Sequence, residues 1–70
     1  MICQYVSSSN LSYVCYEAMV QHLDITFHSG STYRYTSVPA YIHGGLIAAS
    51  SKGRYFDRYI KGIYPYYRIR

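Results

Sequence analysis

The sequence predicts a single α+β domain, in which a three- to four-stranded antiparallel β-meander is followed by two short helices. Two observations lead to this fold class. Residues 22–36 hold two runs of alternating apolar and polar side chains around a glycine turn, which is typical of a β-hairpin. Residues 40–63 instead repeat apolar side chains at helical spacing. Because 70 residues suffice for only one hydrophobic core, residues 1–70 are treated as one domain.

The first strand of the meander is predicted at residues 11–17, LSYVCYE, because β-branched and aromatic side chains are frequent there. Residues 7–10, SSSN, precede it and have the composition of a loop. A short additional pairing strand is expected near residues 4–6, which brings the count to four.

The next two strands form the predicted hairpin. Residues 22–28, HLDITFH, place three apolar side chains on one face, those of Leu23, Ile25 and Phe27. Such strict alternation predicts a strand with one buried face. A turn that contains a glycine then leads into the returning strand at residues 31–36.

A first helix is predicted within residues 40–50. Ser37 is a candidate N-cap, and Pro39 suits the first helical turn. The paired glycines Gly44 and Gly45 each lower the helix propensity by about 1 kcal/mol relative to alanine. They indicate a helix that is short, kinked or in close contact with the sheet.

A second helix is predicted to begin after Ser51, a candidate N-cap, and to close near Gly62 and Pro65. Its core-facing side chains follow helical spacing and are Tyr55, Phe56, Tyr59, Ile60 and Ile63. A second stripe at positions i, i+4 and i+7 carries the charges of Arg54, Arg58 and Lys61. The sequence therefore predicts an amphipathic helix with a basic outer face.

A chain of this size usually needs a disulfide, a metal or a partner subunit for its stability. Cys3 and Cys15 are too few for a disulfide-rich framework, and residues 1–10 lack the apolar run of a secretion signal. We therefore expect both thiols to be reduced, a cytoplasmic location, and self-association into a homo-oligomer. No segment reaches the roughly 18 apolar residues of a membrane span, so we expect no membrane partner.

Positive charge is concentrated towards the end of the chain. The formal net charge is +4, and six of the seven lysines and arginines lie in residues 52–70. Such a distribution favours an anionic partner, either a nucleic acid or a small phosphate-bearing nucleotide. The alternative is a solvated basic face that only keeps the protein soluble.

The start of the second helix is a candidate phosphate site, because unpaired backbone N–H groups and the helix dipole favour an anion there. The candidate residues are Ser51, Lys52, Gly53, Arg54, Arg58 and Lys61. Their pattern differs from a nucleotide-binding P-loop, which needs two glycines followed by lysine and serine or threonine. The alternative is an ordinary serine cap beside a basic surface.

Tyrosines next to arginines form a second candidate surface. The C-terminal segment contributes Tyr66, Tyr67 and Arg68. Such a mixture suits single-stranded nucleic acid, whose bases stack on rings while basic side chains contact phosphates. The alternative is that these rings belong to the core or to a subunit interface.

The central segment Tyr33, Arg34 and Tyr35 offers similar chemistry. The rings of Tyr33 and Tyr35 share one face of a predicted strand, and RNA-recognition sheets use exposed rings in this way. Alternatively, both rings share the core face and Arg34 points outwards. Periodicity alone does not distinguish these arrangements.

No catalytic or metal site is predicted. The acidic residues are Glu17, Asp24 and Asp57. His22 and His28 lie six residues apart in one strand, which separates them by roughly 20 Å and prevents them from sharing a metal ion. The polar face of this strand, with His22, Asp24 and His28, is therefore expected to be solvated. Neither a cofactor nor an enzymatic activity is expected.

Four segments are distributed over nearly the whole chain: VSSSNL at 6–11, YRY at 33–35, VP at 38–39 and ASSKGRYFDRYIKGIYPY at 49–66. These segments resemble the KTSC domain, a family named for its occurrence at the C-terminus of some lysyl-tRNA synthetases and also found alone in bacteria and their phages. Asp57 departs from the asparagine that is common after Tyr-Phe in such domains. The resemblance implies a small α+β domain with RNA binding as its suggested role, and it implies no catalytic residue.

Together, these observations favour a non-enzymatic binding module for RNA or another nucleic acid. A first alternative is an oligomeric phage protein that sequesters a small nucleotide immune signal in pockets of basic side chains and tyrosines. A second alternative is a structural or protein-interaction module whose charges only keep it soluble.

Overall fold

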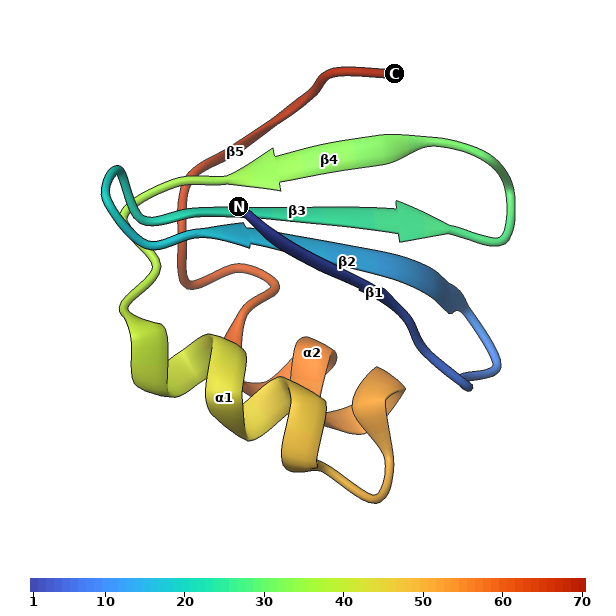
Figure 1. The fold of residues 1–70 in the computed structure, drawn as a ribbon. Helices are drawn as coiled ribbons and strands as arrows, with labels where there is room; N and C mark the ends of the chain where they lie inside the picture. The colour runs from blue at the N-terminus through green and yellow to red at the C-terminus, as the bar shows by residue number, and fades with distance from the viewer.

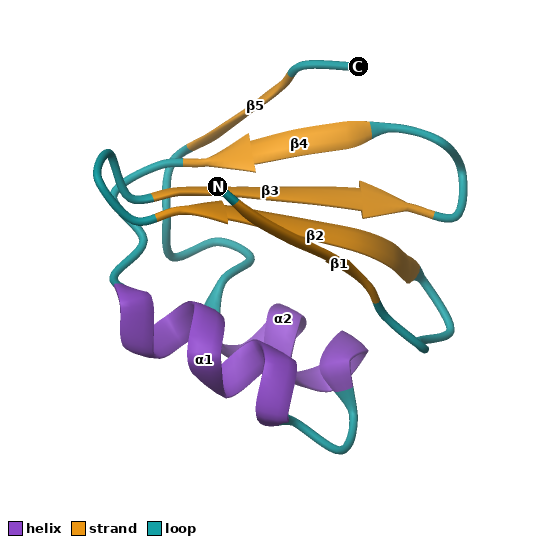
Figure 2. Cartoon of the chain, viewed as in Figure 1, coloured by secondary structure: helices purple, strands orange, loops and turns teal.

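The computed structural model describes residues 1–70 and has two layers, a five-stranded antiparallel sheet and two helices that cover one face of it (Figure 1). The strands lie in the sheet in sequence order. The elements are β1 Ile2–Tyr5, β2 Leu11–Glu17, β3 His22–Phe27, β4 Thr32–Tyr35, α1 Ala40–Ala48, α2 Lys52–Tyr59 and β5 Tyr66–Arg68. Figure 2 shows the strands in one layer and both helices in the other. The predicted α+β class and its β-meander are therefore confirmed.

The predicted strand count is too low, because the C-terminal segment forms a fifth strand beside β4. The register pairs Tyr35 with Tyr66 and Arg34 with Tyr67. All three residues of β5 are exposed, so the strand has no buried face and leaves no alternation in the sequence. In Figure 1 the chain returns from α2 to place β5 at the edge of the sheet.

The hairpin of β3 and β4 forms as predicted. Gly30 occupies its turn with φ +97°, in the left-handed region that favours glycine. The register pairs Leu23 with Tyr35 and Ile25 with Tyr33. The rings of Tyr33 and Tyr35 therefore share the face that the helices cover, and Tyr35 is only 4% exposed.

The hydrophobic core lies between the covered face of the sheet and the helices. It consists of 11 buried residues: Leu11, Val14, Tyr16, Leu23, Ile25, Tyr35, Val38, Ile42, Leu46, Phe56 and Ile60. β2, β3 and β4 contribute most of the sheet side, and each helix contributes from its inner face. The opposite face of the sheet carries no helix (Figure 1).

The expectation of a solvated polar face on β3 is wrong at Asp24, which is 8% exposed. Arg34 lies opposite it in the register. The Nε and Nη2 atoms of Arg34 donate hydrogen bonds to the two carboxylate oxygens of Asp24 at 2.8 and 2.9 Å. This paired geometry satisfies the buried carboxylate, and the hydrogen bonds that Arg34 donates to Asp24 are the largest cause that raises the pKa of Arg34. The sequence pattern of β3 did not indicate this ion pair, because Arg34 belongs to the next strand, β4.

The predicted N-cap of the first helix is also wrong. α1 begins at Ala40 after Pro39, and no side chain caps it. Ser37 instead has a φ of +59°. The next residue, Val38, is fully buried, and its N–H donates to the carbonyl of Gln21 at 2.9 Å. The chain is therefore fixed to the β2–β3 turn before the helix begins.

Ser51 caps α2 as predicted, since its Oγ accepts a hydrogen bond from a backbone N–H of the first turn at 3.4 Å. The predicted core stripe is only partly correct. Phe56 and Ile60 are buried, whereas Tyr59 is 43% and Ile63 57% exposed. The helix ends at Tyr59, so Ile63 falls outside the helical period on which the prediction depended.

The expectation that both thiols are reduced is wrong, because Cys3 and Cys15 form a disulfide. The two residues are register partners in β1 and β2, and their Cα atoms lie 4.0 Å apart. The strand predicted near residues 4–6 begins too late: β1 starts at Ile2, so Cys3 lies inside it. The domain therefore has a covalent cross-link, and its cysteines no longer support a cytoplasmic location or self-association.

The paired glycines of α1 have different surroundings, which predicts opposite effects of alanine. A Cβ at Gly45 would lie 2.7 Å from Cζ of Tyr55, whereas a Cβ at Gly44 meets nothing within 4 Å. We expect Gly45→Ala to lower the free energy of unfolding by about 1–2 kcal/mol, because overpacking outweighs the gain in helix propensity. The control Gly44→Ala should raise it by up to about 1 kcal/mol. Urea denaturation measures both, and a stabilising Gly45→Ala would contradict the close packing.

Candidate functional site

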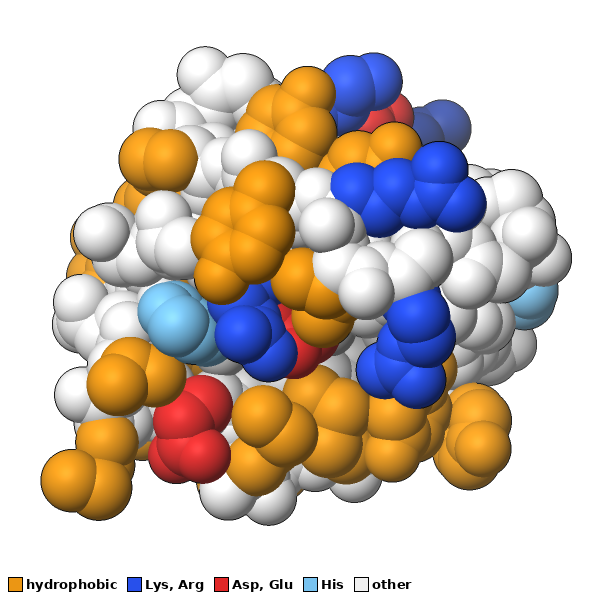
Figure 3. Space-filling model, turned by 90° about the horizontal axis from the view of Figure 1, so that it is seen from above, with side chains coloured by type: hydrophobic (Ala, Val, Ile, Leu, Met, Phe, Trp, Pro, Cys, Tyr) orange, Lys and Arg blue, Asp and Glu red, His pale blue; other side chains and the backbone are white.

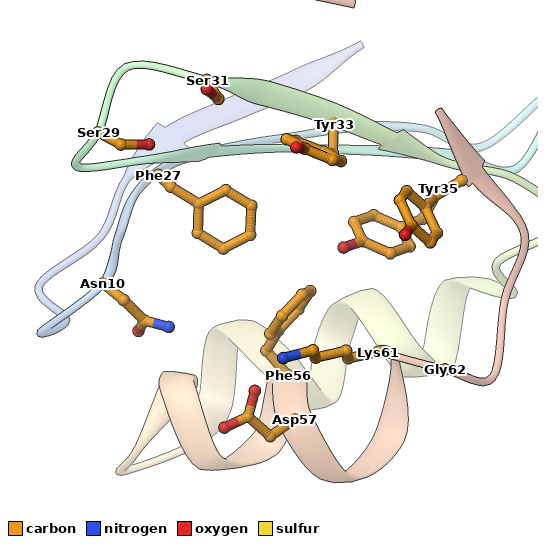
Figure 4. Close-up of a pocket in the computed structure, with 11 residues that line it drawn as sticks. Asn10, Phe27, Ser29, Ser31, Tyr33, Tyr35, Phe56, Asp57, Lys61 and Gly62 are labelled. Atoms are coloured by element: carbon orange, nitrogen blue, oxygen red, sulfur yellow. The ribbon is translucent and has the colours of Figure 1, made fainter. Parts of the chain in front are cut away.

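A cavity of about 510 Å³ opens between the covered face of the sheet and α2 (Figure 4). Its walls come from strands β3, β4 and β5, from α2 and the turn that follows it, and from two loops. The lining residues are Asn10, Phe27, Ser29, Ser31, Tyr33, Tyr35, Phe56, Asp57, Lys61, Gly62 and Tyr66. We call this cavity the aromatic pocket. Its volume lies in the range of small-molecule sites, roughly 300–1,000 Å³.

Five aromatic rings form the apolar part of the lining. The ring centroids of Phe27 and Phe56 lie 5.5 Å apart, as do those of Phe56 and Tyr35. The ring centroid of Tyr66 lies 5.4 Å from that of Tyr35 and 5.7 Å from that of Tyr33. Tyr33 lies 6.0 Å from Phe27. These contacts close into a ring of five side chains from β3, β4, β5 and α2.

The five rings differ in exposure, which shows where the pocket opens. Phe56 and Tyr35 are each 4% exposed and form its floor. Phe27 and Tyr33 are half-buried, and Tyr66 is 57% exposed at the edge strand. An aromatic surface that runs from the core to the solvent offers ring faces on which a flat ligand can stack.

The floor of the pocket is uncharged at neutral pH. Burial raises the pKa of Tyr35 to about 12, with smaller contributions from Tyr66 and Tyr33. The Tyr35 hydroxyl therefore remains protonated and can donate a hydrogen bond. The charges of the pocket are confined to its rim.

Polar side chains surround the opening. Asn10, Ser29 and Ser31 line one part of the rim, and Asp57 and Lys61 line another. Both charged residues are exposed, and neither belongs to either of the two ion pairs in the structure. In Figure 4 both side chains extend from α2 and its following turn towards the opening. The rim therefore offers a negative acceptor and a positive donor without a protein partner.

A serine of the same loop holds the side chain of Asn10 at the pocket. The Oγ atom of Ser8 donates to Oδ1 of Asn10 at 3.1 Å in the loop before β2. Gly53 allows this amide to approach the start of α2, because a Cβ there would lie 2.8 Å from the same oxygen. Gly53 of the predicted phosphate site therefore has a packing role that any side chain would disturb.

Four of the predicted site residues line the aromatic pocket: Tyr33, Tyr35, Lys61 and Tyr66. The central segment does not act as one surface. Tyr33 and Tyr35 face the helices, whereas Arg34 lies on the other face of the sheet and is paired with Asp24.

A second group of predicted residues lies around the start of α2. A shallow depression of about 310 Å³ is lined by Ala49, Ser50, Ser51, Arg54, Tyr55, Arg58 and Tyr59. Lys52 lies next to it, and its Nζ donates to the carbonyl of Ala49 at 3.0 Å. The guanidinium of Arg58 lies 5.8 Å from the ring centroid of Tyr59. Several of these groups therefore already have partners within the chain.

The remaining predicted residues lie at the edge and outer face of the sheet. Tyr67 is the register partner of Arg34, and Arg68 is the partner of Tyr33. The Nε atom of Arg68 donates to the carbonyl of Arg70 at 2.9 Å. Figure 3 looks onto the side away from the helices, where basic side chains lie at separate places among hydrophobic ones. The predicted residues are thus divided among three places.

The sequence patterns do not indicate the other lining residues, which are Asn10, Phe27, Ser29, Ser31, Phe56, Asp57 and Gly62. Phe27 and Phe56 were assigned to core faces, and alternation cannot tell which core side chain borders an opening. Asp57 was considered as one of the three acidic residues and as a departure from a family pattern, and it was assigned to no site. The one available signal was the ring of Phe27 at the end of its alternating run.

The structure contains no group of three or more histidine, cysteine, aspartate or glutamate side chains that could hold a metal ion. Neither helix has the length and apolar character that crossing a bilayer requires. The lining of the aromatic pocket itself offers ring faces for stacking, polar groups for hydrogen bonds, and two charged side chains.

Comparisons with known proteins identify relatives over most of the chain. The model of the KTSC domain matches residues 7–64. Lysine–tRNA ligases from Trichormus variabilis and from a Nostoc species are each 43% identical over 54 residues, which is 77% of this chain but 10% of each ligase. An uncharacterized protein from Stutzerimonas stutzeri is 38% identical over 65 residues, 91% of this chain and 92% of that protein. The chain thus spans about a tenth of the length of the ligases.

A solved structure is also similar. The crystal structure of a KTSC domain protein from Yersinia pestis has a TM-score of 0.94 and 38% sequence identity. The similarity covers 99% of this chain and 97% of that chain. Both edge strands therefore fall within the part that the two proteins share.

Proposed function

The chain belongs to the KTSC domain family, and from that premise we propose that it is a non-enzymatic module that binds single-stranded RNA, with one base held in the aromatic pocket. The observation that carries this proposal is the closed set of five rings between the sheet and α2. Bases stack on aromatic side chains, and each such contact contributes about 1–3 kcal/mol.

Charge near the pocket suits a phosphate backbone. Lys61 lies at the rim, and Arg58 and Arg54 extend the positive charge along α2. All three are exposed or line open depressions. Basic side chains that contact the phosphates of an RNA strand contribute affinity but do not distinguish one base sequence from another.

The relatives give separate support for an RNA partner. Two of them are, by name, lysine–tRNA ligases, enzymes for which an RNA is a substrate. This chain is similar to one short part of those proteins. We therefore choose RNA over a lone nucleotide as the first ligand to test.

Replacing the exposed ring of the pocket should weaken RNA binding. We expect Tyr66→Ala to raise the Kd of a short mixed-sequence single-stranded RNA by about tenfold, because a stacking face is lost. The matched control is Tyr41→Ala on α1, whose ring is 74% exposed and outside the pocket; its Kd should not change. Fluorescence anisotropy with a labelled hexanucleotide measures both, and equal losses would contradict the pocket.

The affinity should also depend on salt. Phosphate contacts release counterions, so the logarithm of the association constant falls linearly with the logarithm of the salt concentration. Lys61→Met should reduce this slope by about 0.7, the value for one phosphate contact with a single strand. An affinity that stays constant between low and moderate salt would contradict the proposal.

A further inference from the structure

We infer that the aromatic pocket selects guanine, with the carboxylate of Asp57 as the group that reads the base. This inference rests on the proposed function, because it requires that a base enters the pocket. It concerns the two charged groups of the rim, Asp57 and Lys61, which stacking alone does not use.

Asp57 determines which edge of a base fits. An ionised carboxylate is an acceptor only, with two oxygens that can receive two parallel hydrogen bonds. Among the four RNA bases, guanine alone presents two adjacent N–H donors, N1–H and the N2 amino group, on its Watson–Crick edge. Adenine and cytosine offer one amino group beside an acceptor nitrogen. Uracil has a single N–H between two carbonyl oxygens, which a carboxylate repels.

Lys61 completes the match. Asp57 lines the aromatic pocket from α2 and Lys61 from the turn that follows this helix, and both side chains extend towards the opening (Figure 4). An ammonium group donates hydrogen bonds only, and the O6 carbonyl of guanine lies next to N1–H. A donor beside an acceptor-only group is therefore complementary to the guanine edge, on which an acceptor lies beside two donors.

Both groups are available for a ligand. The ion pairs of the structure involve Glu17 and Asp24, the other two acids of the chain, and no side-chain hydrogen bond engages Asp57 or Lys61. The two charges also remain separate, because no pair forms between them within 4.0 Å. The cavity of about 510 Å³ is large enough for a purine with its ribose.

The test is a set of NMR titrations of the ¹⁵N-labelled protein with GMP, IMP, AMP, CMP and UMP at one salt concentration. We expect GMP to bind at least about fivefold more tightly than AMP, CMP or UMP, which is the lower limit for a good bidentate base contact. IMP lacks only the N2 amino group, so it should bind about fivefold more weakly than GMP. Equal affinities for the five nucleotides overturn guanine selection and leave the proposed function intact.

Asp57→Asn is the decisive variant, because asparagine keeps the shape but offers only one acceptor. It should remove the preference for GMP while AMP binding remains. The control is Glu17→Gln, which changes the net charge equally at the far end of β2 from the pocket, and it should keep the preference. A preference that survives Asp57→Asn overturns the role of this carboxylate.

Two oligonucleotides distinguish the source of the base. One is a uridine hexamer with a single central guanosine, and the other has adenosine at that position. Tighter binding of the guanosine strand together with GMP selectivity supports a guanine within RNA, whereas GMP selectivity without strand binding supports a free guanine nucleotide. The absence of binding to any nucleotide or strand overturns the proposed function itself.

Discussion

Replacing Asp24 with alanine is expected to lower the free energy of unfolding by about 3 kcal/mol, because it leaves the guanidinium of Arg34 without its partner. Asp24 is 8% exposed and accepts two hydrogen bonds from Arg34. Removing one member of a buried pair typically costs about 3–5 kcal/mol. We take the lower end, since the Arg34 side chain is 27% exposed and regains some water.

Two further variants test the origin of this loss in urea denaturation. Asp57→Ala removes a carboxylate that is exposed and unpaired, so its effect should stay within about 0.5 kcal/mol. The double variant Asp24→Leu/Arg34→Met should recover much of the stability, because an apolar pair of similar size needs no charge compensation. A loss below about 1 kcal/mol for Asp24→Ala would show that the pair contributes little.

Removing the disulfide is expected to lower the free energy of unfolding by about 3 kcal/mol, the value for a loop of this length. Cys3 and Cys15 are separated by 12 positions in the sequence. β1 pairs only with β2, and all four of its residues are exposed. The strand thus has little burial of its own to hold it in place.

The double variant Cys3→Ser/Cys15→Ser tests this in urea, and native protein in dithiothreitol provides the matching reduced state. Both should unfold at the same urea concentration, which should be lower than that of the oxidised native protein. Adding dithiothreitol should not change the unfolding midpoint of the double variant. Mass spectrometry after thiol alkylation reports whether the bridge is present. Equal midpoints with and without the bridge would show that β1 is held by its backbone hydrogen bonds alone.

The strands with a buried face could be predicted from the sequence, whereas of the two without one, β1 was predicted to begin too late and β5 was missed. Leu23 and Ile25 alternate with polar residues because β3 has the core on one side. The edge strands β1 and β5 consist entirely of exposed residues, so neither has a burial pattern. The disulfide was missed for the same reason, since Cys3 lies on β1.

The site could be predicted only in part. Tyr33, Tyr35 and Tyr66 were recognised as candidate rings, but the sequence could not show that Phe27 and Phe56 close the set. Such closure depends on how α2 crosses the sheet, which no local pattern contains. From the sequence, Lys61 was grouped with Arg54 and Arg58 at the start of the second helix, whereas the fold places Lys61 at the aromatic pocket.

The measurement that tests the aromatic pocket most directly is chemical-shift mapping of the labelled protein with a short single-stranded RNA. The expected result is one saturable set of changes centred on the ring signals of Phe27, Tyr33 and Tyr66 and on the backbone of Asp57 and Lys61. Changes centred instead on the outer face of the sheet or on the start of α2, or no changes at all, would contradict the assignment of this pocket as the binding site.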